Sequence, residues 1–223
     1  MKLYQLRTIS NPHYAHIHAQ MGQDTSIDKK LSVTWDNYLA KGNLISDFCY
    51  SSYLICLRRI AEKLMEKYTG LSYIELSWGK NPKELISKNP KKLKWLPQSN
   101  VDYVHILSYN SVPFLDISTL RMAPNLCTKL PAISEIIGGS HYSISEKKII
   151  PREKGHGLFI SEKTIEHLDF FCPLNTPILL CKEWVKDEIE KEDYKGLIFL
   201  EVGETIRNLK KLLSNELAEQ NKD

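Results

Sequence analysis

Three histidines near the start of the chain form the pattern H-x-x-H-x-H, as His13, His16 and His18. In a strand, His16 and His18 would lie on one face, as two metal ligands could. No aspartate or glutamate lies beside them, and the nearest is Asp24. A further ligand or a supporting carboxylate would have to come from elsewhere in the chain. We therefore expect surface or loop histidines and no metal site.

Cys56 and Cys181 each lie between a run of apolar residues and a charged, helix-like segment. A thiol at the N-terminus of a helix can have a lowered pKa and act as a nucleophile. The neighbours of both thiols are apolar, however, and Ser161 holds the corresponding place in a third segment. This pattern favours a small buried residue. It leaves open a hydrolase or transferase that uses a Cys or His at a strand–helix junction.

The five cysteines are widely spaced and include no C-x-x-C pair. Such spacing suits free thiols in a reducing cytosol better than a disulfide framework or a zinc site. The chain also lacks the G-x-S-x-G, G-x-G-x-x-G, H-E-x-x-H and EF-hand patterns. We therefore expect no catalytic residue, no cofactor and no metal.

A basic cluster with one aromatic residue lies in a segment rich in lysine and proline, and consists of Lys91, Lys92, Lys94 and Trp95. Such a cluster could follow phosphates and stack on a base. It could also contact an acidic protein, or be an exposed loop, which is the default. A net charge of only +3 gives no support to nucleic-acid binding. We rank contact with a protein above contact with nucleic acid.

A second candidate surface is the acid-rich helix that we expect from Lys182 to Asp193. It carries Glu183, Trp184 and Asp187, which combine two carboxylates with one large aromatic ring. Together with the basic cluster, these residues are the candidate partner-binding residues of the chain.

The composition is that of a folded domain, with 223 residues, 42% of them hydrophobic and 26% charged. The first residues, MKLYQLRTISNP, include no apolar stretch typical of a secretory signal. The apolar runs are far shorter than the about 20 residues that a membrane-spanning helix needs. We therefore expect a cytoplasmic protein with no membrane contact.

Periodicity predicts an α+β (mixed α/β) fold with helices packed on a mixed sheet. Apolar residues recur at helical spacing from Leu57 to Met65, at Val185 and Ile189, and again from Ile206 to Leu217. The last of these segments predicts a C-terminal helix. Short apolar or alternating runs predict strands at 3–9, 71–76, 101–107, 114–117, 158–160, 177–181 and 197–202.

A strand–helix–strand unit occurs twice, at Tyr53–Leu76 and at Ile178–Glu201. Aligning Cys56 with Cys181 superimposes the apolar positions of the two units, and Leu158–Leu168 resembles a shorter third copy. Duplication and a chance likeness between two common units stay open as equal alternatives. After one inserted residue, the same alignment pairs Tyr68 with Tyr194, Gly70 with Gly196 and Glu75 with Glu201.

We expect one domain that spans residues 1–223. The alternative is two lobes, 1–78 and 99–223, joined by the Lys- and Pro-rich segment 79–98.

This layout of apolar strand, small residue, charged helix, glycine and strand resembles the immunity proteins of bacterial polymorphic toxin systems, specifically the immunity protein forty-three family and its relatives. The likeness extends over about residues 45 to 202. The residues that carry it are Ser46-Asp47-Phe48 with Tyr53–Leu64, Phe114–Ser118, Leu158–Lys163, and Ile178–Phe199 with Tyr194–Leu197.

The resemblance implies a bacterial cytoplasmic antidote rather than an enzyme. Such proteins bind a cognate toxin, often one delivered by contact-dependent or type VI secretion, and block it by direct contact. Charge complementarity and a few buried aromatic or arginine anchors would give the specificity. The alternatives are the small enzyme described above and a nucleic-acid-associated protein that uses Lys91 to Trp95.

Overall fold

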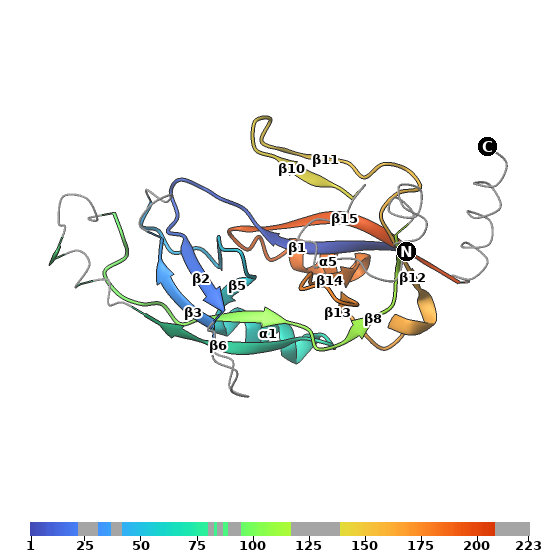
Figure 1. The fold of residues 1–223 in the computed structure, drawn as a ribbon, viewed down its shortest axis with the longest axis horizontal. Coiled ribbons are helices and arrows are strands. Elements are labelled where there is room, and N and C mark those ends of the chain that lie inside the picture. Colours follow the sequence, from blue (N-terminus) through green and yellow to red (C-terminus); the bar gives the residue numbers. More distant parts are fainter. Residues whose placement is uncertain are drawn as a thin grey trace.

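The structure is a computed structural model, and it describes residues 1–21, 31–36, 42–79, 83, 87–88, 95–116 and 139–207. Within these residues the chain forms a six-stranded sheet, a seven-stranded sheet and a separate two-stranded hairpin (Figure 1). Two α-helices accompany the strands. The mixed α/β fold predicted from the sequence is confirmed, with strands as the larger part.

The six-stranded sheet has the order β4-β5-β7-β6-β3-β2. Neighbours are antiparallel except β6 and β3, which are parallel. The strands are β2 (Ile17–Met21), β3 (Leu31–Trp35), β4 (Phe48–Cys49), β5 (Ile55–Leu57), β6 (Ser72–Trp78) and β7 (Tyr103–Leu107).

The seven-stranded sheet has the order β8-β13-β14-β1-β15-β12-β9. Neighbours are antiparallel except β8 with β13 and β15 with β12. The strands are β1 (Lys2–Thr8), β8 (Ser111–Val112), β9 (Leu115–Asp116), β12 (Leu158–Ser161), β13 (Phe170–Pro173), β14 (Leu180–Lys182) and β15 (Leu197–Ile206).

The two sheets therefore share one order and one set of strand directions, apart from the extra edge strand β8. In the six-stranded sheet β7 lies between β5 and β6. In the seven-stranded sheet β1 holds the corresponding place, between β14 and β15. The first strand of the chain thus belongs to the sheet built mainly from the C-terminal half, whereas β7 belongs to the sheet built mainly from the N-terminal half. Strands from both sides of the segment 79–98 therefore occur in each sheet.

The helices α1 (Arg58–Lys67) and α5 (Glu183–Glu190) each follow a short strand without a connecting loop. Their apolar residues recur at helical spacing, so each helix buries one face. Ile60, Ala61 and Leu64 are buried in α1, and Val185 and Ile189 are buried in α5. The sequence predicted both helices at these positions.

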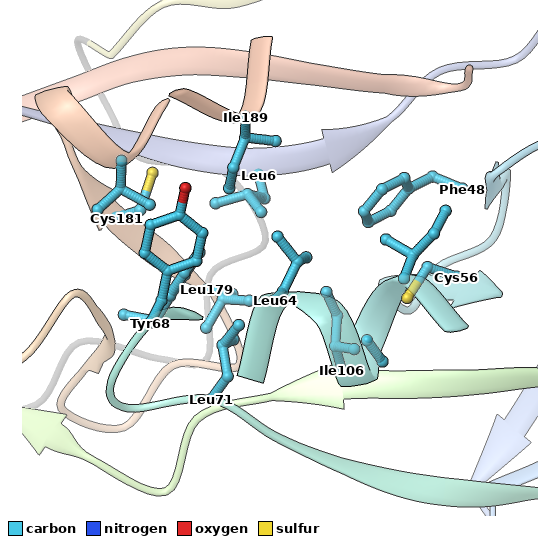
Figure 2. Packing of buried hydrophobic residues seen from close by; sticks show 14 of the residues in the cluster. Leu6, Phe48, Cys56, Leu64, Tyr68, Leu71, Ile106, Leu179, Cys181 and Ile189 are labelled. Carbon is cyan, nitrogen blue, oxygen red and sulfur yellow. The ribbon is translucent and has the colours of Figure 1, made fainter. Parts of the chain in front are cut away.

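One central hydrophobic cluster joins the two sheets and both helices (Figure 2). It includes Phe48 and Ile106 from the six-stranded sheet, and Leu6 and Cys181 from the seven-stranded sheet. Two further clusters lie apart from it. The second contains Val33 and its neighbours, and the third contains residues of β12, β14 and β15. Both sheets therefore contribute side chains to one shared hydrophobic cluster.

Two predicted elements differ from the structure. Ile206 is the last residue of β15 rather than the start of a helix, and the remainder of the predicted C-terminal helix lies outside the described residues. The helix expected after Leu158–Ile160 is a single 3-10 turn, Glu162–Ile165. Phe170 begins the next strand four residues after Glu166, which leaves no room for a longer helix.

Candidate protein-interaction surface

Trp184 is the most prominent side chain on the exposed face of α5, and 44% of it is accessible to solvent. Its ring packs against Tyr68, with 5.8 Å between the ring centroids. Tyr68 in turn is buried and contacts the Phe170 ring at 5.7 Å. The tryptophan therefore rests on a chain of tilted and edge-on ring contacts that ends in the central cluster.

Ion pairs line the seam where α1 meets α5 and the turn that follows it. Lys63 Nζ lies 2.6 Å from Glu192 Oε2, and Lys67 Nζ lies 3.0 Å from Glu188 Oε2. The Tyr68 hydroxyl also donates a hydrogen bond to Glu188, at 2.9 Å. The hydrogen bond from Lys67 is the main reason that the pKa of Glu188 lies below its ordinary value. All the lysines of this seam come from α1 and all the glutamates come from the α5 side.

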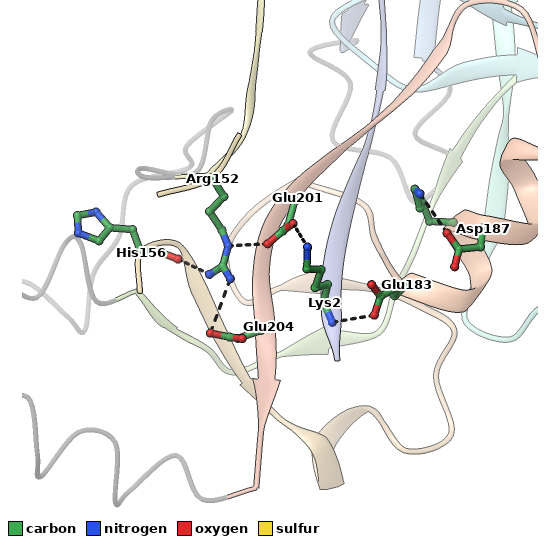
Figure 3. A network of polar contacts seen from close by, with 8 residues as sticks. Lys2, Arg152, His156, Glu183, Asp187, Glu201 and Glu204 are labelled. Atoms are coloured by element: carbon green, nitrogen blue, oxygen red, sulfur yellow. Dashed lines mark hydrogen bonds and ion pairs between the residues drawn. The ribbon is translucent and has the colours of Figure 1, made fainter. Parts of the chain in front are cut away.

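The other two predicted residues of α5 are engaged within the chain. Glu183 Oε2 accepts a hydrogen bond from the backbone N–H of Lys2, at 3.4 Å, and Asp187 lies 3.0 Å from Lys186 Nζ. Both contacts are part of the polar network in Figure 3. Of the predicted residues on α5, Trp184 is therefore the one whose side chain offers exposed apolar area.

Glu201 is the centre of that network (Figure 3). Its carboxylate accepts hydrogen bonds from Lys2 Nζ at 2.8 Å and from Arg152 Nε at 2.9 Å. Burial alone would raise the pKa of Glu201, but the two hydrogen bonds and the positive charges outweigh it and lower this pKa. Arg152 also donates to the His156 carbonyl oxygen at 2.5 Å and lies 3.7 Å from Glu204.

The sequence did not predict that Arg152 and Glu201 form an ion pair. The arginine lies in a loop and the glutamate lies in a strand far away in sequence. No local pattern connects the two, and only the tertiary structure brings them together.

The basic cluster predicted from the sequence is described only at Trp95, since Lys91, Lys92 and Lys94 lie outside the described residues. Trp95 is half-buried and packs against the second cluster, near the buried Leu96. Trp184 instead packs at a tilt against Tyr68, a residue of the central cluster. The structure therefore assigns the two predicted aromatic residues to different packing clusters.

The two thiols at the strand–helix junctions are fully buried. Cys56 lies in β5 and Cys181 in β14, and each precedes its helix by one intervening residue. Burial raises the pKa of both thiols far above the ordinary value. Cys49 and Cys172 are buried too, and burial raises the pKa of Cys49 to about 12. Neutral, inaccessible thiols of this kind are poor nucleophiles.

The three histidines differ in environment. His13 and His18 are exposed, whereas His16 is buried and packs at a tilt against Tyr50, with 4.8 Å between ring centroids. His16 therefore lies in a loop, as one form of the expectation has it, but not at the surface. Across the described ranges, no group of three or more His, Cys, Asp or Glu side chains is arranged to hold a metal ion.

No protein-family model matches this chain. A search of curated proteins also gives no match. Within the part of the chain that the structure describes, no helix is both long and apolar enough to cross a membrane.

Proposed function

We propose that this chain is an immunity protein of the bacterial cytoplasm, which neutralises a cognate protein toxin by binding to it directly. The observation that carries the proposal is Trp184, a large exposed ring on a rigid, charged seam between two helices. Tryptophans that become buried on binding are among the commonest anchors of protein–protein interfaces. The sequence resemblance to toxin immunity proteins points in the same direction.

The surroundings of Trp184 suit such an anchor. Tyr68 holds the ring from below, so little rotamer freedom remains to be lost on binding. Lys67 and Glu188 pair with each other beside it. A polar rim around an apolar centre is the usual arrangement of an interface. Opposite charges on the two sides of the seam would fix the orientation of the partner.

The two alternatives receive less support from the described residues. The enzyme hypothesis, in the form that uses a cysteine, needs a reactive thiol at Cys56 or Cys181, and both are buried with a raised pKa. The nucleic-acid hypothesis needs Trp95 as a stacking platform, and Trp95 is partly occupied by packing against the second cluster. Neither alternative is supported by an exposed aromatic ring that is held in place as Trp184 is.

We also infer that the fold arose by tandem duplication, with each repeat donating its first strand to the sheet of the other. The first repeat would run from β1 to β6 and the second from β7 to β15. The identical sheet orders support this inference, as do the reciprocal positions of β7 and β1. Matching ring contacts support it as well: Tyr68 with Phe170 at 5.7 Å, and Tyr194 with Phe48 at 5.9 Å.

The ion pairs of the helix seam obey the same relation. The alignment that pairs Cys56 with Cys181 also pairs Lys63 with Glu188. At the same spacing it pairs Lys67 with Glu192. The pair Lys63–Glu192 therefore corresponds to the pair Glu188–Lys67, with the charges reversed. If two copies of the first repeat packed together, Lys63 of one copy would face Lys67 of the other. The charges therefore favour packing of the first repeat against the second.

Co-expression tests the proposed function. The proposal predicts that the gene of the cognate toxin lies directly upstream of the gene of this chain. The toxin domain of that gene would be expressed in a sensitive bacterium, with and without the full chain. We expect survival with the wild-type chain and reduced survival with Trp184→Ala at equal levels of folded protein. A matched control, Leu174→Ala, replaces an apolar residue that is 47% exposed in the turn after β13, and this variant should protect fully. Death of cells that contain soluble, folded wild-type protein would refute the proposal.

A further inference from the structure

The hairpin formed by β10 (His141–Ser143) and β11 (Lys148–Ile150) stands apart from both sheets (Figure 1). Its strands pair with each other, and within the described ranges neither pairs with another strand. Isolated two-stranded hairpins are marginally stable in water at best. Something other than sheet packing must therefore hold this one in place.

Both ends of the hairpin are fastened to Glu201 in β15. On the entering side, the Ser140 N–H donates to the backbone carbonyl of Glu201 at 2.7 Å. On the leaving side, Arg152 Nε donates to the Glu201 carboxylate at 2.9 Å (Figure 3). The Arg152 side chain is only 9% exposed, so this ion pair is shielded from water and stronger than a surface pair. The hairpin base is therefore rigidly placed.

The tip of the hairpin is ordered by its own polar residues and exposes an apolar one. The Glu146 N–H donates to Ser143 Oγ at 3.2 Å, and Lys147 adopts a positive φ of 53° that closes the turn. Ile144, in this turn, is 85% exposed. Ile149 is exposed as well, and it pairs across the strands with Tyr142.

The hairpin is not needed to build the sheet. It lies between β9 and β12, which are antiparallel neighbours joined through residues 117–157. Their counterparts in the other sheet, β2 and β3, are joined through residues 22–30 alone. A rigidly anchored, apolar-tipped projection with no role in the sheet is expected to serve contact with another molecule.

We propose that this hairpin is an arm that inserts Ile144 into an apolar cleft of the toxin, a cleft rimmed by carboxylates. The inference rests on the proposed function and names its contact element. The shape argues for a concave partner, because the arm is convex and narrow. The charge argues for an acidic rim: Lys148 pairs with Glu146, whereas Lys147 and Lys154 have no ion-pair partner among the described residues.

The test is binding of the full chain to the purified toxin domain encoded directly upstream. We expect Ile144→Asp to raise the Kd about tenfold or more, because the variant would place a charged carboxylate in an apolar cleft in place of an apolar anchor. Lys147→Glu should weaken binding at low salt more than at high salt. The matched control Leu174→Asp places the same charge at another exposed apolar site and should leave the Kd unchanged. Urea unfolding of each variant verifies that the fold is intact.

The outcomes separate the two proposals. If the wild-type chain binds and Ile144→Asp binds equally well, the arm hypothesis is wrong and the immunity function stands. If the wild-type chain does not bind, both proposals fail. If sedimentation shows wild-type dimers that Ile144→Asp abolishes while toxin binding is unchanged, the arm serves self-association, and the proposed insertion into the toxin is wrong.

Discussion

Gly70 lies so close to Phe170 that a Cβ atom on residue 70 would be 2.0 Å from the carbonyl oxygen of Phe170. The Phe170 N–H also donates to the carbonyl of Thr69 at 3.0 Å. Gly196 stands in the same relation to Phe48, where a Cβ atom would lie 2.1 Å from the carbonyl oxygen. The loop after each helix therefore closes onto a strand that belongs to the other half of the chain.

These contacts predict that Gly70→Ala and Gly196→Ala are strongly destabilising. Both glycines have a positive φ, near 88°, and alanine there costs about 1 kcal/mol before any clash. The overlap with a backbone carbonyl should bring the loss in unfolding free energy above about 2 kcal/mol. Urea denaturation measures the loss.

Gly155→Ala is the matched control for this pair. Gly155 has a positive φ of 78°, but no atom lies within 4 Å of where its Cβ would be. It should therefore cost only the conformational penalty of about 1 kcal/mol. Equal losses for all three variants would show that the close approach of the two halves has no energetic weight.

The exchanged strands predict that two fragments of the chain reassemble. Fragments 1–88 and 89–223 each lack the strand that lies in the middle of their main sheet, because β7 and β1 belong to the other fragment. Each alone should be unfolded or aggregated, and co-expression should give a one-to-one complex with a native circular dichroism spectrum. Two fragments that fold separately as monomers would contradict the exchange.

Local patterns in the sequence were sufficient for α1 and α5 and for about half of the described strands; they did not predict β2, β3, β4, β8, β10, β11 or β13. The spacing of Ile60 and Leu64 predicts α1, and Val185 and Ile189 predict α5, because amphipathic periodicity depends only on near neighbours. The pairing of β1 with β14 and β15 was not predictable. A strand carries no local mark of its partner, and here the partners come from opposite ends of the chain.

Sequence reasoning reached only part of the candidate site. Trp184 was chosen from its type and its place on a charged helix, and in the structure 44% of this residue is exposed. Its support by Tyr68 and the fastening of the hairpin by Arg152 are long-range contacts, which periodicity cannot encode. His16 was expected at the surface or in a loop; it lies in a loop, but its ring is buried against Tyr50.

The buried cysteines predict slow reaction with thiol reagents. Cys49, Cys56, Cys172 and Cys181 are all buried, and burial raises the pKa of each thiol. In native protein at pH 8 they should react with an aromatic disulfide reagent only as fast as the chain unfolds. Urea should accelerate the reaction of these thiols many-fold. Rapid modification of Cys56 or Cys181 in native protein, mapped by mass spectrometry, would instead revive the enzyme hypothesis.

His16 predicts a loss of stability in mild acid. Burial lowers the pKa of this imidazole and outweighs the opposing influences of the Asn11 backbone and of the Asp36 charge; Nδ1 has no hydrogen-bond partner among the described residues. Below pH about 6.5 the unfolded chain binds a proton that the folded chain resists. The free energy of unfolding should therefore fall as the pH falls from 6.5 and level off below the folded-state pKa.

His16→Gln provides the comparison, because glutamine has no proton to gain in this range. Unfolding free energies of both proteins, measured by urea denaturation from pH 7.5 to pH 5, should diverge in their slopes, with the steeper loss in the wild type. Parallel pH profiles would mean that His16 titrates alike in the folded and unfolded states.

Titration of toxin activity tests the central claim most directly. The purified toxin domain encoded directly upstream would be assayed with increasing amounts of the purified full chain. The immunity function predicts that activity falls to the baseline at a defined molar ratio, and that Trp184→Ala shifts the curve to higher concentration. Full toxin activity in the presence of excess folded wild-type protein would contradict the account.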